Sequence, residues 1–154
     1  AIEIHGEGVV VLVAVAVLDV DQALVVGPQV AEDVAGGGGG DDVISGGAGD
    51  DWLSGEGGDD TLTGGANQDY FQFGDNDGDD VITDFNIYED RIHFLTNESP
   101  VRDVYVEHAD GNTIIHYGNT SITLQGLTLG LNEVARAMLV VDGSRFTYHT
   151  MGDA

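Results

Sequence analysis

The sequence predicts an all-β protein: a parallel β-roll, preceded by N-terminal strands and followed by an antiparallel β cap with one short helix. The main observation is a nine-residue repeat that occurs four times between Gly37 and Gln72. So short a period indicates a solenoid, in which each repeat packs on its neighbours. A valine-rich segment before the repeats and alternating polar and apolar residues after them indicate the additional strands.

All four copies follow one pattern. Glycines or turn-tolerant residues fill the first four positions, an acid holds the sixth, and a large apolar residue holds the eighth. Because glycine adopts conformations that other residues avoid, we expect the first five or six residues to form a tight loop. The last three residues are expected to form a short strand whose middle side chain points inward. The copies read GGGGDDVIS from Gly37, GGAGDDWLS from Gly46, GEGGDDTLT from Gly55 and GGANQDYFQ from Gly64.

A loop and a short strand make half a coil, so two copies close one turn. Asp42 and Asp60 are then expected at one edge of the roll, and Asp51 and Asp69 at the other. Stacked carboxylates repel each other unless a cation lies between them. Carboxylates and backbone carbonyls are hard oxygen ligands that suit Ca²⁺, whereas Mg²⁺ demands a stricter octahedral geometry.

The copies resemble the calcium-binding nonapeptide of RTX (hemolysin-type) proteins. The chain is similar to the C-terminal β-roll module of serralysin-like proteases and alginate epimerases. The resemblance implies several Ca²⁺ ions, each held by backbone carbonyls of one repeat and by a carbonyl and the sixth-position aspartate of a repeat two further on. Glu56 and Asn67 replace loop glycines, and Gln68 replaces an acid in the last copy. We expect the fold to tolerate these changes and the site around Gln68 to be weaker. The candidate metal ligands are Asp33, Gly37, Gly38, Gly39, Gly40, Asp41, Asp42, Gly46, Gly47, Ala48, Gly49, Asp50, Asp51, Gly55, Gly57, Gly58, Asp59, Asp60, Gly65, Asn67, Asp69, Asp80 and Asp84.

Three of these candidates lie outside the four copies. Asp33 precedes Asp42 by one period and is expected to belong to a degenerate earlier repeat. Asp80 is the sixth residue of a further copy that is shifted by an insertion of two residues. Asp84 belongs to an I-T-D-F segment that resembles the end of an RTX roll, so Asp80 and Asp84 are either terminal ligands or ordinary turn acids.

The domain organisation follows from these patterns: N-terminal strands in residues 1–30, the calcium-binding roll in 31–85, and a β cap with a region that loosely resembles a secretion signal in 86–154. The apolar run from Val9 to Leu18 is too short to span a membrane as a helix, and its valines favour a strand. A second strand is expected from Ala23 to Val26. These strands either cap or extend the roll, or pair with another chain.

Beyond the repeats, a hairpin is predicted between strands 103–108 and 113–117, with a third strand at 121–125. We expect this layer to pack on the last coils and seal them. His108 and His116 are expected to face each other across the hairpin. Leu131 to Val141 is predicted to be a helix capped by Asn132.

The charge of the chain is strongly negative: 28 acids face four arginines and no lysine, for a formal net charge of −24. Such a chain resists compaction until its charge is neutralised, so metal binding and folding are expected to be coupled. The negative charge also argues against nucleic acids and anionic membranes as partners. No cysteine is present, so disulfides cannot cross-link the chain. We expect bound calcium to provide the stabilisation that disulfides give to other secreted proteins.

No catalytic motif is found, since neither H-E-x-x-H nor G-x-S-x-G occurs, and the chain is predicted not to be an enzyme. Three functions stay open. The first is a folding and stability module of a secreted protein. The resemblance implies that such a module leaves a Gram-negative bacterium by type I secretion, with the secretion machinery and a fused catalytic domain as partners. The second is a self-assembling structural or adhesive protein outside the cell. The third is a carbohydrate-binding module that uses Trp52 and Tyr70.

Overall fold

The structure is a computed structural model that describes residues 15–17, 23–25, 34–74, 76–95, 103–140 and 147–151. Asp33 and most of the apolar run from Val9 to Leu18 lie outside these residues, so the predictions made for them concern parts of the chain that are not described.

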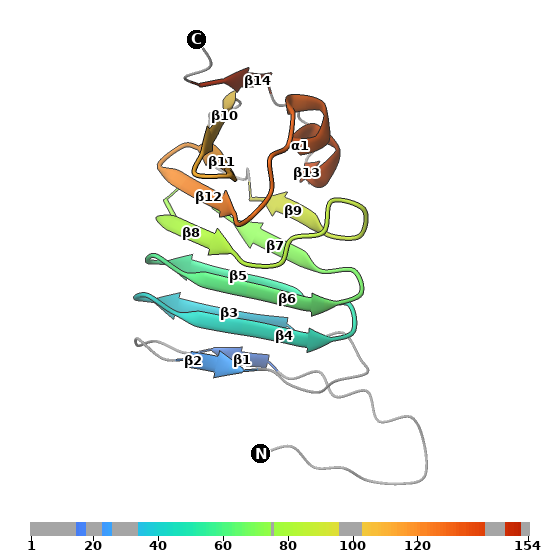
Figure 1. Ribbon diagram of the computed structural model, residues 1–154. Helices are drawn as coiled ribbons and strands as arrows, with labels where there is room; N and C mark the ends of the chain where they lie inside the picture. Colours follow the sequence, from blue (N-terminus) through green and yellow to red (C-terminus); the bar gives the residue numbers. More distant parts are fainter. Residues whose placement is uncertain are drawn as a thin grey trace, which may run out of the picture.

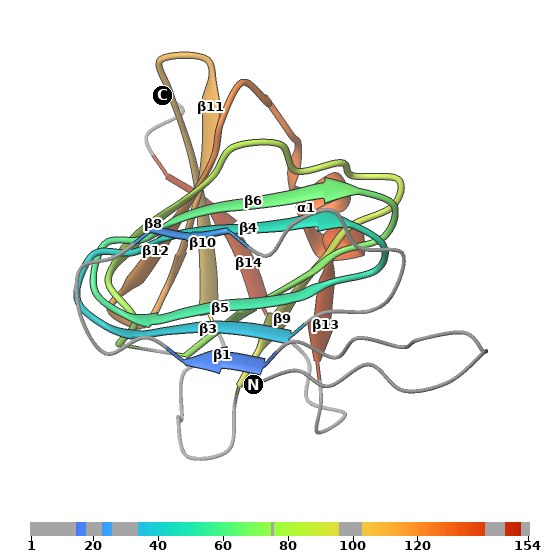
Figure 2. The same cartoon turned by 90° about the horizontal axis from the view of Figure 1, so that it is seen from below.

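The chain winds into stacked coils, and each coil contributes one strand to each of two facing sheets (Figure 1). Sheet A has the strand order β1-β3-β5-β7-β9-β13, and sheet B has the order β14-β10-β11-β12-β8-β6-β4-β2. Seen along the axis of the coils, the two sheets enclose the core, and loops join them at both edges (Figure 2). The predicted parallel β-roll is confirmed. The strands of the coils are β1 (Val15–Val17), β2 (Ala23–Val25), β3 (Val34–Gly39), β4 (Val43–Ala48), β5 (Trp52–Gly57), β6 (Thr61–Ala66), β7 (Tyr70–Phe73), β8 (Asp79–Ile82) and β9 (Arg91–Phe94).

The eighth residue of each copy points into the core, as predicted. These four side chains, Ile44, Leu53, Leu62 and Phe71, are completely buried. Their strands pair in parallel with a residue offset of two copies, as in the pair Ile44 and Leu62. The buried residues of successive coils therefore stack into one continuous core.

The strands are longer than predicted. β4, β5 and β6 each continue through the first three positions of the next copy, which we expected to be loop. Glycine lacks a Cβ, so the backbones of successive coils approach closely enough to keep pairing there, as at Gly47 and Gly65. The true turns are therefore confined to the middle of each copy.

The register changes after the fourth copy. Leu62 pairs with Ile82, an offset larger by two residues than in the repeats, which confirms the predicted insertion. In sheet A, Phe71 pairs with Ile92 of β9. The roll thus continues past Phe85 into a further irregular half-coil.

At the N-terminal end, two short strands extend the roll. β1 pairs in parallel with β3, and β2 pairs in parallel with β4. Each of the two sheets therefore begins with one of these three-residue strands.

The C-terminal cap contains the predicted meander, and this meander covers the edge of the last coil in sheet B. Strands β10 (Asp103–Ala109), β11 (Asn112–Tyr117) and β12 (Thr120–Leu124) are antiparallel. We expected this layer to pack on the last coils and seal them; it does so by strand pairing, because β12 pairs in parallel with β8 and continues sheet B. The free edge of β8 offers unpaired backbone groups, and pairing satisfies them. A further strand, β14 (Thr147–Thr150), pairs with β10.

The predicted helix from Leu131 to Val141 is too long. Helix α1 spans Leu131–Ala137, and Met138–Val140 form strand β13, which pairs with β9 at the edge of sheet A. The helix is capped at Gly130 and not at Asn132, because the Glu133 carboxylate accepts a 2.8 Å hydrogen bond from the Gly130 N–H. The described parts of the chain contain no helix with the length and apolar character needed to cross a membrane.

The predicted contact between His108 and His116 is wrong. His108 pairs with Thr113, and His116 pairs with Tyr105, so the two histidines are not opposite each other. His108 Nε2 lies 2.7 Å from the Leu129 carbonyl, which ties the hairpin to the segment before α1.

Candidate metal centre

The sixth-position aspartates lie at the two edges of the roll, where the sequence predicted them. They are almost completely buried, with exposed fractions of 0% or 1%. Two further aspartates at equivalent places extend the series. Edge one carries Asp42, Asp60 and Asp80, and edge two carries Asp51, Asp69 and Asp90.

Each edge is held by a ladder of hydrogen bonds in which one carboxylate oxygen accepts from the backbone of the preceding coil. On edge one, Asp60 Oδ1 accepts from the Asp42 N–H at 2.7 Å, and Asp80 Oδ1 accepts from the Asp60 N–H at 3.0 Å. On edge two, Asp69 Oδ1 accepts from the Asp51 N–H at 3.0 Å. The side chains therefore point toward the N-terminal end of the roll.

In three of these aspartates, the second carboxylate oxygen has no such partner among the described residues. The Oδ2 atoms of Asp60, Asp69 and Asp80 are buried and accept no hydrogen bond from the described residues. A buried, unsatisfied carboxylate oxygen costs free energy when the group is charged. Burial accordingly raises the pKa of Asp60, raises that of Asp69 to about 7 and raises that of Asp80 to about 8, and neighbouring acids add to each increase.

The surroundings of these oxygen atoms suit a hard cation. A Cβ placed on Gly55 would collide with Asp60 Oδ2, and one placed on Gly64 would collide with Asp69 Oδ2. At the equivalent Gly37, a Cβ would lie only 2.7 Å from the Gly55 carbonyl oxygen, so oxygens crowd a place that only glycine leaves open. Within the described residues, no three acidic or histidine side chains converge on one point. An ion at these edges must therefore take most of its ligands from backbone carbonyls, and such an all-oxygen set fits Ca²⁺.

The comparison with protein families decides what these repeats are. The family model described as the RTX calcium-binding nonapeptide repeat, in four copies, matches residues 36–71. Residues 36–71 are RTX repeats. The match implies that this segment binds Ca²⁺.

Solved structures with RTX-like coils resemble the fold. One is the AlgE6R3 subunit of the Azotobacter vinelandii mannuronan C5-epimerase, with a TM-score of 0.56 and 23% identity over 77% of this chain and 78% of that one. Another is the extracellular lipase LipA of Serratia marcescens, with a TM-score of 0.54 and 22% identity over 80% of this chain but only 20% of the lipase. No curated protein matches the sequence. At 23% and 22% identity, these comparisons show a shared fold and nothing further.

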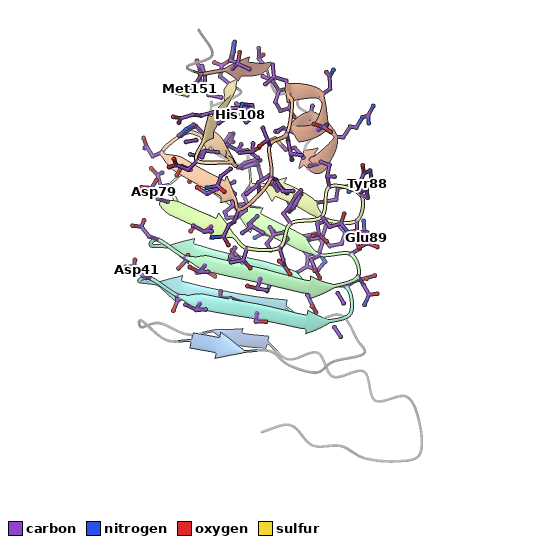
Figure 3. The ribbon with its side chains drawn as sticks, in the orientation of Figure 1. Asp41, Asp79, Tyr88, Glu89, His108 and Met151 are labelled. Atoms are coloured by element: carbon purple, nitrogen blue, oxygen red, sulfur yellow. The ribbon has the colours of Figure 1, made fainter. Side chains whose placement is uncertain are left out.

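The fifth-position acids of the RTX copies form a second ladder, which runs in the opposite direction. Asp41 Oδ1 accepts from the Asp59 N–H at 2.9 Å, and Asp59 Oδ1 accepts from the Asp79 N–H at 3.0 Å. These side chains are exposed and point toward the following coil; Asp41 and Asp79 lie on the same edge (Figure 3). On edge two, Asp50 makes the same bond to the Gln68 N–H at 3.1 Å, so the replacement of an acid by Gln68 leaves this rung intact.

The replaced loop glycines keep the backbone of the RTX turn. Glu56 and Asn67 have φ values of 69° and 82°, in the left-handed region that glycine favours. Gly58, with φ of 136°, cannot be replaced so easily, because a Cβ there would collide with the Gly40 carbonyl. The coils thus approach each other through backbone atoms at the turns.

The candidate ligands of the four copies fall into two groups, one at each edge. Asp84 belongs to edge two: it is exposed, and its two oxygens accept hydrogen bonds from the Gly64 and Gly65 N–H groups at 2.9 and 2.8 Å. It therefore caps the backbone of the fourth copy. Edge one contains the candidates within 37–42 and 55–60 together with Asp80, and edge two contains those within 46–51 and 65–69 together with Asp84.

Asp90 is the residue that we did not predict. Its Oδ1 accepts from the Asp69 N–H at 3.0 Å, as a sixth-position aspartate would, but its Oδ2 accepts from the Asn86 N–H at 2.8 Å. Both oxygens are therefore satisfied by the protein. The segment Asp90-Arg91-Ile92 repeats the acid and apolar spacing of the sixth and eighth positions, and this spacing was the available signal.

Proposed function

We propose that this chain is a calcium-dependent folding module of a secreted protein. The observation that carries the proposal is the set of buried Oδ2 atoms of Asp60, Asp69 and Asp80, which lack hydrogen-bond partners among the described residues. A fold that buries such oxygens needs a cation to become stable at neutral pH.

In this mechanism, the free calcium concentration of a compartment determines whether the repeats fold. Where free calcium is scarce, as in the cytosol, repulsion within a chain of net charge −24 keeps the repeats unfolded and able to pass a type I secretion channel. Outside the cell, Ca²⁺ binds the folded coils but not the unfolded chain and shifts the equilibrium toward the roll. The module then stabilises the protein to which it belongs, such as a fused catalytic domain. The lipase supports this proposal, because the similar region is 20% of that chain.

We propose that ions bind where the buried Oδ2 of Asp60, Asp69 or Asp80 lacks a hydrogen-bond partner among the described residues. Asp60 and Asp80 give two on edge one, and Asp69 gives one on edge two. Asp90 ends edge two without an ion, because Asn86 already satisfies its second oxygen.

The test is a calcium titration of the metal-stripped chain, followed by far-ultraviolet circular dichroism, with magnesium as the control. We expect a cooperative gain of β signal with Ca²⁺ and none with Mg²⁺ at the same concentration. A spectrum that is already folded without metal and does not change with Ca²⁺ would overturn the proposal.

A second candidate function is calcium-stabilised self-assembly outside the cell. It is favoured by the terminal strands β1 and β2, because each carries one edge that is not paired within its sheet in the described chain. Light scattering of the calcium-loaded protein, with and without residues 1–26, tests this function. Polymers that require residues 1–26 support it, and a monomer in both cases rules it out.

A further inference from the structure

The outer face of sheet A carries a group of side chains that calcium binding does not use. We call Trp52, Tyr70, Gln72, Arg91 and His93 the sheet A patch; they lie on the adjacent strands β5, β7 and β9. Tyr70 is paired with both Trp52 and Arg91, and Gln72 is paired with His93. All five are half-buried, so they form one surface.

The aromatic rings of the patch contact each other. The rings of Trp52 and Tyr70 are stacked, with centroids 4.6 Å apart and planes inclined by 11°. The Trp52 ring also reaches toward β9, where its centroid lies 5.4 Å from that of His93 in an edge-on arrangement. The rings therefore hold one another in fixed positions, which lowers the entropy cost of binding a ligand.

The charge of the patch differs from that of the rest of the molecule. None of its five residues is acidic, and one is an arginine, in a chain with 28 acids. The acids of the repeats are gathered at the edges of the roll instead. A polyanion would be repelled by these edges, whereas a neutral ligand would not.

The patch also offers unused hydrogen-bonding capacity. His93 Nδ1 has no hydrogen-bond partner among the described residues, but it is buried and does not face a ligand at the surface. Burial lowers the pKa of His93, so its ring is neutral at pH 7. The Gln72 amide adds donor and acceptor groups beside this ring.

We propose that the sheet A patch binds a neutral saccharide. A pyranose ring has an apolar face of C–H groups that packs on aromatic rings, and its hydroxyls need donors and acceptors such as Gln72 and Arg91. A cross-strand aromatic pair that only stabilises the sheet requires neither the polar neighbours nor the absence of acids.

The single tryptophan of the chain makes the test direct, because its fluorescence reports on the patch alone. The calcium-loaded protein is titrated with cellohexaose, laminarihexaose and mannohexaose, and with an acidic hexauronate as the charged probe. We expect a saturable change of fluorescence with at least one neutral hexaose and none with the hexauronate. If no neutral hexaose binds, or if the hexauronate binds more tightly, the proposal is wrong.

Two variants keep Trp52 as the reporter. Tyr70→Ala removes the stacked ring, and we expect it to weaken saccharide binding about tenfold. Gln72→Ala leaves the rings in place and is expected to weaken binding by a smaller factor; it remains informative if Tyr70→Ala unfolds. Thr61→Ala, at the position of sheet B that corresponds to Tyr70, is the matched control and should bind as the unchanged protein does. Equal affinity in all three variants, with unchanged circular dichroism, would overturn the assignment.

Discussion

A sixth-position aspartate has opposite effects on the protein without and with calcium. Without the ion, Asp60 places a charged oxygen in a buried site, and burial together with Asp42 and Asp41 raises its pKa. With the ion, the same oxygen becomes a ligand. One substitution should therefore separate the two effects.

We predict that Asp60→Asn stabilises the metal-free roll and weakens calcium binding. The amide oxygen can keep the hydrogen bond from Asp42, but the neutral group loses the repulsion and also the charge that attracts the ion. The calcium concentration at the folding midpoint should rise at least about tenfold. Calcium titrations followed by circular dichroism measure both effects.

The matched control is Asp110→Asn, which removes an exposed acid from the turn between β10 and β11. Asparagine tolerates the φ of 55° found there. A midpoint that shifts equally in both variants would mean that overall charge, and not the site, sets the calcium affinity.

Glu56 adopts a backbone conformation that glycine would adopt at lower cost. Its φ is 69°, so Glu56→Gly should raise the free energy of unfolding by about 0.5–1 kcal/mol. Denaturant unfolding at saturating calcium measures the change. The control is Ser54→Gly in the same strand, which should lower the free energy of unfolding by about 0.5–1 kcal/mol. If both variants lose stability, the backbone of Glu56 is not strained.

At the scale of the strand, inward and outward residues contribute differently. Leu62 is completely buried between coils, so Leu62→Ala should lower the free energy of unfolding by about 2–5 kcal/mol. Thr61→Ala, one residue away on the outer face, should change it by less than about 1 kcal/mol. Thermal unfolding of the calcium-loaded variants tests the difference; similar losses would mean that the core is not continuous along the roll.

The coil could be predicted because one short pattern specifies it. Glycines mark the turns, and the spacing from the acid to the apolar residue fixes which side chains lie at the edge and which lie inside. This spacing predicted both the edges for Asp42 and Asp51 and the shift at Asp80. It also occurs at Asp90, where irregular turns on either side hid it.

Other features depend on tertiary contacts that no local pattern records. The extension of β4 to β6 through glycines depends on pairing between coils, which overrides the weak strand preference of glycine. The end of α1 at Ala137 depends on β9, whose edge draws Met138–Val140 into a strand. The partner of Asp84, the backbone of Gly64 and Gly65, lies about one coil away and could not be read from the I-T-D-F segment. Which candidates bind calcium stays a prediction.

For the whole molecule, a rise in pH should lower the stability of the metal-free roll and raise that of the calcium-bound roll. In the metal-free roll, the pKa of Asp69 is about 7 and that of Asp80 about 8, above the ordinary value of 3.8. Between about pH 4 and pH 8 the folded chain therefore binds more protons than the unfolded chain, and its stability falls as pH rises.

We thus expect metal-stripped protein to show more β signal in circular dichroism at pH 5 than at pH 8. In calcium-saturated protein, protons compete with the ion, so acidification should lower the thermal midpoint. If the metal-free spectrum is constant over this interval, the buried carboxylates do not control folding.

The two ends of the roll are unlike, and this difference gives its formation a direction. At one end, β12 and β13 already occupy the edges of β8 and β9, whereas β1 and β2 at the other end are three-residue strands. The meander is held by local antiparallel pairing, so we expect it to serve as a seed on which coils are added one at a time. The roll would then grow from its C-terminal end, as a polymer grows from a seed. Each added coil would complete the calcium site that the previous coil left open.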